Sequence, residues 1–141
     1  MPGRKIEHAG MLAVVIDTSA SIAVKTLERF LAEVVSVATA EGIDELRLLQ
    51  ADAVVTSDQV LFSAELLFQP LAIVGRGGTC FAPALEKLER DAKRQGQPFT
   101  VVYLSDLDGK FGGKPTHLDV LWVAPALPKV APPFGRVLLL D

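Results

Sequence analysis

Hydroxyl and carboxylate side chains gather where apolar segments of the chain end. The five candidate ligands of a metal ion are Asp17, Ser19, Ser21, Thr79 and Asp106. The first three follow the apolar segment 11–16, the last follows the apolar segment 99–104, and Thr79 ends a glycine-rich stretch. Because oxygen ligands suit hard divalent cations, these residue types predict a site for Mg²⁺ or Mn²⁺.

The spacing of these residues also suits one ion. Alternate positions of the segment 17–21 can point three oxygens toward one point as a strand turns into a helix. Two carboxylates and three neutral hydroxyls roughly balance the charge of a divalent ion. They leave the ion electrophilic, with water at an open coordination position.

Each piece of this pattern has a simpler interpretation when it is taken alone. Ser and Asp after a strand are common helix N-caps, and a Gly-Gly-Thr stretch is usually only a loop. An Asp after an apolar strand often forms a turn. The metal interpretation is favoured because all three pieces occur in order, each at a predicted strand end or helix start.

The elements that must position these residues alternate along the chain. Short apolar runs predict strands, at residues 11–16, 46–51, 99–104, 118–124 and 137–140. Residues 53–56 continue the second strand or turn back as an edge strand, and the apolar residues of 57–78 show no clear period. Strands that alternate with helices predict a doubly wound, mostly parallel α/β sheet of the Rossmann-like type.

Two helices are predicted from apolar residues that recur at intervals of three and four. The stripe of the first helix consists of Leu27, Phe30, Leu31, Val34, Val37 and Ala38. Gly42 is its expected stop. The second helix covers residues 81–95, with Pro83 tolerated in its first turn.

The bulk composition restricts the class of protein. The chain has 141 residues, 50% of them hydrophobic, and a net charge of −3. We expect one domain over residues 11–141, preceded by a linker or cloning remnant at 1–10. Neither nucleic acid nor a membrane is an expected partner, because no basic excess and no membrane-length apolar run occur. Cys80 is the single cysteine, which makes a reducing cytoplasm the simplest location.

The candidate ligands resemble the metal-ion-dependent adhesion site of von Willebrand factor A domains. The matching sequence is Asp17-Thr18-Ser19-Ala20-Ser21, followed by Thr79 and Asp106. In that family a glycine usually precedes the second serine, where this chain has Ala20. The late aspartate of the family often lies in Thr-Asp-Gly, whereas here it lies in Ser105-Asp106-Leu107.

Most of the chain resembles a bacterial von Willebrand A-like domain that lies C-terminal to a metallopeptidase-like domain. The matching segments are Phe30-Leu31-Ala32-Glu33, Ala51-Asp52-Ala53, Gly75-Arg76-Gly77-Gly78-Thr79, Trp122-Val123 and Pro132-Pro133-Phe134-Gly135-Arg136. The resemblance makes Asp52 and Cys80 secondary candidates for the site. The family commonly has Asp at the position of Cys80.

The resemblance also implies a function. A Glu or Asp side chain of a protein partner completes the metal sphere in such domains, so we expect metal-dependent protein binding and no catalysis by this domain. Related bacterial modules work with MoxR-type AAA ATPases, which makes such an ATPase or an upstream metallopeptidase-like domain an expected partner.

The sharpest rival is a phosphatase of the haloacid dehalogenase type. Asp106 and Asp108 flank one residue after a strand, as the nucleophile and the acid do in such enzymes. Only 33 residues follow Asp108, which is too few for a normal cap and the later acidic Mg²⁺ motif. Serine hydrolase chemistry is weaker still, since the chain has no Gly-x-Ser-x-Gly sequence.

The last two predicted strands should lack cover within the chain. Residues 107–117 and 125–136 are rich in Gly and Pro, so neither is expected to form a long covering helix. Apolar parallel strands normally need cover on both faces. We therefore expect one open face that packs against a second copy, a partner or another domain. The alternative is that these two segments fold over the sheet and seal it.

Overall fold

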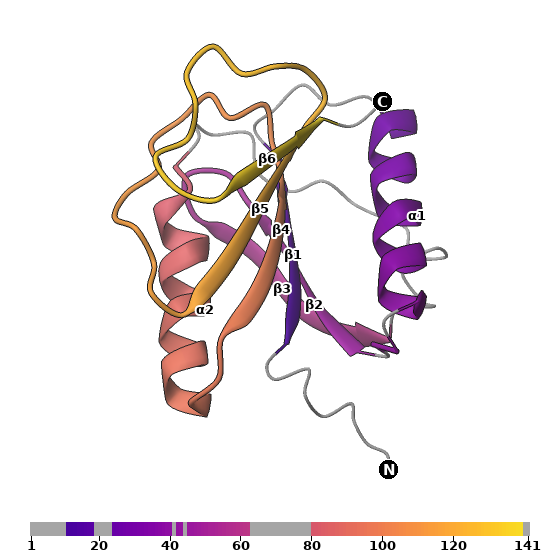
Figure 1. Cartoon of the computed structure of the whole chain (residues 1–141), viewed down its shortest axis with the longest axis vertical. Helices are drawn as coiled ribbons and strands as arrows, with labels where there is room; N and C mark the ends of the chain where they lie inside the picture. Colours follow the sequence, from indigo (N-terminus) through magenta and orange to yellow (C-terminus); the bar gives the residue numbers. More distant parts are fainter. Residues whose placement is uncertain (1–10, 19–23, 41, 44, 63–79, 140–141) are drawn as a thin grey trace.

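The computed structural model describes residues 11–18, 24–40, 42–43, 45–62 and 80–139. Within them a single sheet separates helix α1 from helix α2 (Figure 1). The elements are β1 Leu12–Asp17, α1 Val24–Ala40, β2 Glu45–Ala51, β3 Val55–Phe62, α2 Ala82–Gln95, β4 Phe99–Leu104, β5 Leu118–Ala124 and β6 Arg136–Leu139. No helix in these residues is long and apolar enough to cross a membrane.

The strand order is β3-β2-β1-β4-β5-β6, and every neighbouring pair except β2–β3 is parallel. This confirms the predicted doubly wound, mostly parallel α/β fold. The chain leaves β1 toward β2 on one side, and β4 leads toward β5 on the other. The carboxyl ends of β1 and β4 therefore form the switch point of the sheet, where ligands bind in folds of this class.

Helix α1 packs on one face of the sheet through the predicted apolar stripe. Phe30, Leu31 and Val34 are buried there against side chains of β1 and β2. Val37 was predicted to belong to this stripe, but it is 57% exposed. A stripe spaced by three and four residues drifts around a helix of 3.6 residues per turn. Val37 therefore lies on the flank of α1, beside strands that α1 does not cover.

The opposite face is covered by α2 and by the two irregular segments that were expected to leave strands open. Phe111 and Phe134 pack against the fully buried ring of Trp122, with centroid distances of 5.2 and 5.9 Å. The Trp122 Nε1–H donates to the Phe134 carbonyl at 2.9 Å. On this face the loops after β4 and β5 cover β5, and Trp122 lies in the core, whereas every residue of β6 stays exposed.

The antiparallel strand β3 forms one edge of the sheet, which settles the assignment that the sequence left open. Ionic contacts connect this edge to α2. The Arg47 guanidinium lies 2.7 Å from Asp58 on β3 and 2.7 Å from Asp91 on α2. Although burial opposes it, the hydrogen bond from Arg47 holds the pKa of Asp58 below its ordinary value.

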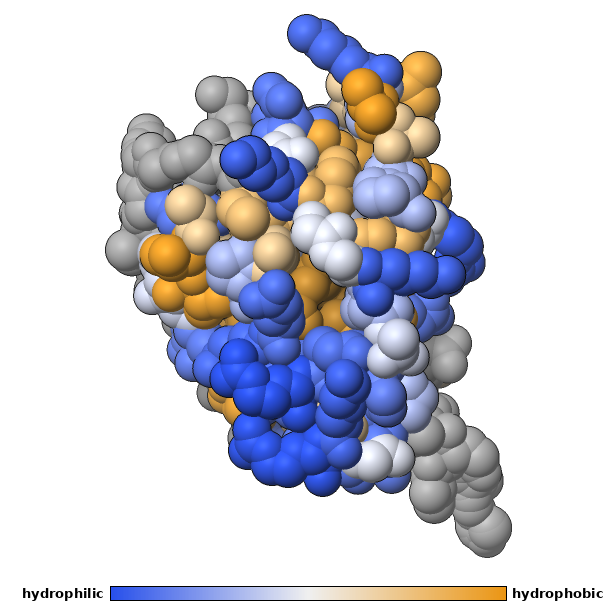
Figure 2. Space-filling model, turned by 90° about the vertical axis from the view of Figure 1, so that its left-hand side faces the viewer, coloured by the Kyte–Doolittle hydropathy of each residue, from blue (hydrophilic) through white to orange (hydrophobic). Residues whose placement is uncertain are grey.

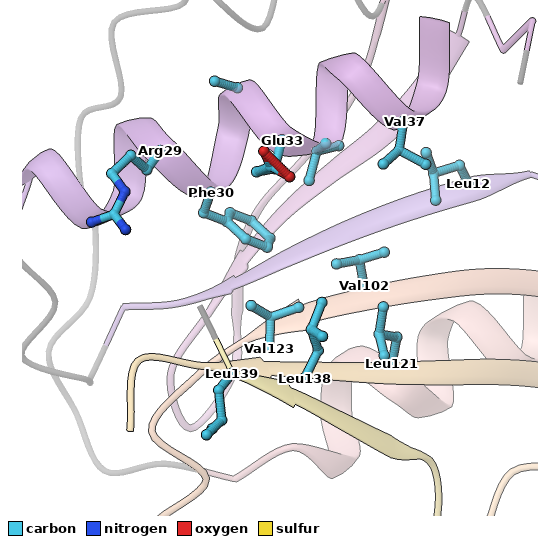
Figure 3. A pocket seen from close by; sticks show the side chains of 12 residues that line it. Leu12, Arg29, Phe30, Glu33, Val37, Val102, Leu121, Val123, Leu138 and Leu139 are labelled. Atoms are coloured by element: carbon cyan, nitrogen blue, oxygen red, sulfur yellow. The ribbon is translucent and has the colours of Figure 1, made fainter. Parts of the chain in front are cut away.

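An open groove runs between α1 and strands β4, β5 and β6 on the α1 side (Figure 3). Its volume is about 500 Å³. The groove is lined by Leu12, Arg29, Phe30, Ala32, Glu33, Val34, Val37, Val102, Leu121, Val123, Leu138 and Leu139. Leu138 is 54% exposed and Leu139 is 45% exposed. Among the described residues the last strands therefore have one open face, as expected, and it is the α1 side. On the α2 side the alternative holds for β5, which the Gly- and Pro-rich segments cover.

Candidate metal centre

Asp17 ends β1 at the switch point, and its side chain is almost completely buried. The Ser105 Oγ–H donates to Asp17 Oδ2 at 2.6 Å. The same Ser105 Oγ accepts the Leu107 backbone N–H at 2.9 Å. These two hydrogen bonds connect the end of β1 to the loop that leaves β4, and they fix the orientation of the Asp17 carboxylate.

Asp106 lies between Ser105 and Leu107 in the sequence. Its own side chain is exposed, and its Oδ1 accepts the Asp108 backbone N–H at 3.1 Å. The next residue, Leu107, has a φ of 64°, a left-handed conformation that costs a residue with a Cβ about 1–2 kcal/mol. Burial of the Leu107 side chain against the α2-side core offsets this cost.

Neighbouring strands hold both strand ends in place. The Thr18 backbone N–H donates to the Ala51 carbonyl at 2.9 Å, and the Ser105 N–H donates to the Val123 carbonyl at 3.0 Å. The parallel hydrogen-bond pattern therefore continues to the residues that carry the site. Asp17 and Asp106, which the sequence predicted to share one edge, lie at the carboxyl ends of the adjacent strands β1 and β4.

The two secondary candidates lie at the same edge. Asp52 is buried, and its Oδ1 accepts the Val54 backbone N–H at 3.0 Å, which is a turn between β2 and β3. The Cys80 N–H donates to the Asp52 carbonyl at 3.2 Å, and Cys80 forms an isolated bridge with Lys110. The Asp52 side chain thus stabilises a turn, and the half-buried Cys80 leads into α2.

Tyr103 places a phenol beneath the site. The residue is 1% exposed and packs edge-on against Phe81 at a centroid distance of 5.3 Å. Burial, and then the negative charge of Asp17, raise the pKa of the Tyr103 hydroxyl. The phenol is therefore neutral at physiological pH, and it forms part of the apolar floor under Asp17.

The other three predicted ligands, Ser19, Ser21 and Thr79, lie outside the described residues. Within the described ranges, no three His, Cys, Asp or Glu side chains form a group that could hold a metal ion. The described part of the site nevertheless fits a hard divalent cation, because Asp17, Ser105 and Asp106 provide only oxygen donors at the switch point.

Ser105 is the residue of this site that the sequence analysis did not select. The signal was present, since a hydroxyl residue stands directly before Asp106 at the end of an apolar strand. What the sequence does not contain is the register between β1 and β4. That register, with Ile16 opposite Leu104, brings Ser105 to Asp17.

Comparison with known families places this geometry in a class. Residues 12–141 match the VWA-like domain (DUF2201) family, and the chain belongs to it. Domains of the VWA-like class are generally protein-interaction modules. Among curated proteins, an uncharacterised protein of Thermotoga maritima is 37% identical over 103 residues, which is 73% of this chain. The matched region spans 24% of that protein's length.

Proposed function

We propose that this domain binds a partner protein through a divalent metal ion at the carboxyl edge of its sheet. In this proposal Asp17, Ser19, Ser21, Thr79 and Asp106 hold Mg²⁺ or Mn²⁺. The bound ion supplies an electrophilic position that an Asp or Glu side chain of the partner fills. The domain itself carries out no catalysis.

The observation that carries the proposal is the contact between Asp17 and Ser105 at the switch point. A buried carboxylate is costly unless hydrogen bonds or opposite charge compensate it. Here a serine hydroxyl orients the Asp17 carboxylate, while the Asp106 carboxylate in the loop after β4 faces solvent. This arrangement holds one ligand rigidly and leaves the other accessible from outside.

The loop after β5, at the carboxyl end of the sheet, exposes apolar side chains. Leu127 is 78% exposed and Val130 is 73% exposed, and both lie in the loop after β5. Figure 2 views the α2 side and shows hydrophilic surface on the lower half and more apolar surface toward the upper half. The upper end is where the loops after β4 and β5 lie (Figure 1). Exposed apolar side chains of this kind can form the apolar core of a protein interface, which polar residues surround.

Two kinds of partner fit this proposal. The resemblance to bacterial von Willebrand A-like modules favours a MoxR-type AAA ATPase or a metallopeptidase-like domain. The Thermotoga maritima relative extends far beyond the matched region, which leaves room for a further domain in that protein. Either partner would have to present an acidic side chain to the metal.

Binding of Mn²⁺ to the chain tests the proposal by titration calorimetry and by paramagnetic broadening of NMR signals. We expect broadening around Asp17 and Asp106. Asp17→Asn keeps a hydrogen-bond acceptor for Ser105 but removes the charge, so affinity should fall at least about tenfold. Asp119→Asn changes an exposed aspartate at the start of β5, at the opposite edge, and should leave affinity unchanged.

Two outcomes would contradict the proposal. One is Mn²⁺ affinity in Asp17→Asn equal to that of the unmodified chain. The other is hydrolysis of a generic phosphoester such as p-nitrophenyl phosphate that disappears in both Asp106→Asn and Asp108→Asn. The second result would support the phosphatase interpretation, in which Asp108 donates a proton. For a binding domain Asp108 is dispensable.

A further inference from the structure

The loop that carries Asp106 is fixed at two buried points. Ser105 is fully buried and bonds to Asp17, and Leu107 is 5% exposed and packs into the α2-side core. Asp106 stands between them with an exposed side chain. The backbone that presents Asp106 therefore has little freedom of its own, because both of its neighbours are held.

Ser105 occupies the centre of this arrangement because its hydroxyl makes two hydrogen bonds at once. The hydroxyl donates to Asp17 Oδ2 at 2.6 Å and accepts the Leu107 N–H at 2.9 Å. The second bond closes a short turn around Asp106 and supports the left-handed conformation of Leu107, whose φ is 64°. The first bond joins that turn to the carboxylate on the neighbouring strand.

We propose that Ser105 is a positioning residue that couples the two carboxylates of the site, so that the placement of Asp106 depends on that of Asp17. This inference rests on the proposed metal binding and extends it to a residue outside the ligand set. Ser105 acts through Asp17 and Asp106, and it does not need to touch the ion. A metal ion that binds the Asp17 carboxylate also affects the turn at Asp106, because the Ser105 hydroxyl bonds both to Asp17 and to that turn.

Three variants separate positioning from stability. Ser105→Ala removes both hydrogen bonds, so Mn²⁺ affinity should fall about tenfold. Ser105→Thr keeps the hydroxyl and should restore affinity to within about threefold of the unmodified chain. Leu88→Ala removes a fully buried side chain of α2, outside the Asp106 loop, so it should bind Mn²⁺ normally while being the least stable of the three.

The readouts are Mn²⁺ affinity by calorimetry, unfolding by urea, and the hydrogen exchange of the Leu107 amide. Exchange should accelerate in Ser105→Ala and stay slow in Ser105→Thr. Affinity that follows stability across the three variants, with Leu88→Ala the weakest binder, would overturn the positioning role. Equal affinity in Ser105→Ala and the unmodified chain would overturn it as well. If the unmodified chain binds no Mn²⁺, the proposed metal function fails, and unchanged exchange of the Leu107 amide in Ser105→Ala would then overturn the role of Ser105 by itself.

Discussion

The two faces of strands β4 and β5 are covered in different ways. On the α2 side, irregular loops seal the sheet with aromatic side chains, and Trp122 is completely buried. On the α1 side, the same strands border an open groove, and Leu138 is 54% exposed. A loop without regular structure can therefore replace a covering helix when it supplies large side chains and a hydrogen bond to the sheet.

The largest expected effect comes from removing the centre of the sealed face. Trp122→Ala deletes a buried ring and its hydrogen bond to the Phe134 carbonyl, so the free energy of unfolding should fall by about 3–5 kcal/mol. Leu138→Ala on the open face should cost less than about 1 kcal/mol, because the side chain already contacts solvent. Urea unfolding of both variants measures the contrast. A similar loss in both would show that the groove is covered in solution.

A smaller effect is expected at Gly135, where the loop after β5 meets the sheet. A Cβ at this position would lie 2.8 Å from Trp122 Nε1 and 2.8 Å from the Val120 carbonyl oxygen, and the φ of 79° disfavours any side chain. Gly135→Ala should therefore destabilise the fold by about 2 kcal/mol or more.

Gly96→Ala is the matched control for this prediction. Gly96 has a φ of 71° at the end of α2, but a Cβ there would meet nothing within 4 Å. Gly96→Ala should therefore lower the free energy of unfolding by only about 1 kcal/mol, the cost of a left-handed backbone conformation for a residue with a Cβ. Thermal unfolding of the two variants measures the difference, and equal losses would mean that the Gly135 loop does not press closely on Trp122.

The smallest expected effect concerns Glu89, which connects α2 to the start of β5. Burial raises its pKa, but the Thr116 hydroxyl at 2.7 Å and the His117 and Thr116 backbone N–H groups lower it from 4.5 to about 2. Ionised Glu89 therefore stabilises the fold above pH 4.5, and this contribution is lost as the pH falls toward 2.

Glu89→Gln should accordingly lower the free energy of unfolding by about 1 kcal/mol at neutral pH. The difference between the two proteins should disappear between pH 4.5 and about 2. Urea unfolding across that range measures it. A difference that persists unchanged at low pH would assign the effect to shape and not to charge.

The sequence predicted the buried strands and helices well, because each of them is marked by a pattern of apolar residues within its own segment. Continuous apolar runs identify β1, β4 and β5 to within one residue, and the helical stripe identifies α1. β3 was ambiguous because an edge strand faces solvent and carries polar residues such as Asp58 and Gln59. Val37 was misplaced because its burial depends on what lies beside α1, which periodicity does not report.

The candidate site was predictable in part for the same reason. Asp17 and Asp106 stand at strand ends, and a parallel sheet brings such ends to one edge. The role of Ser105 and the left-handed conformation of Leu107 depend on strand register and on packing beneath the loop. Strand register and packing depend on residues far apart in the sequence, so they could not be predicted from the conformational preferences of single residues. Ser19, Ser21 and Thr79 remain predictions.

The central place of β1 in the strand order has a consequence for biosynthesis. Among the described strands β1 is made before the others, and β2 can pair with it early, but its other edge waits for β4, which is made much later. Until then an apolar strand exposes unpaired backbone groups on one side. Such an edge attracts chaperones and neighbouring nascent chains. The rate at which residues 99–104 reach β1 should therefore govern the yield of folded protein during translation.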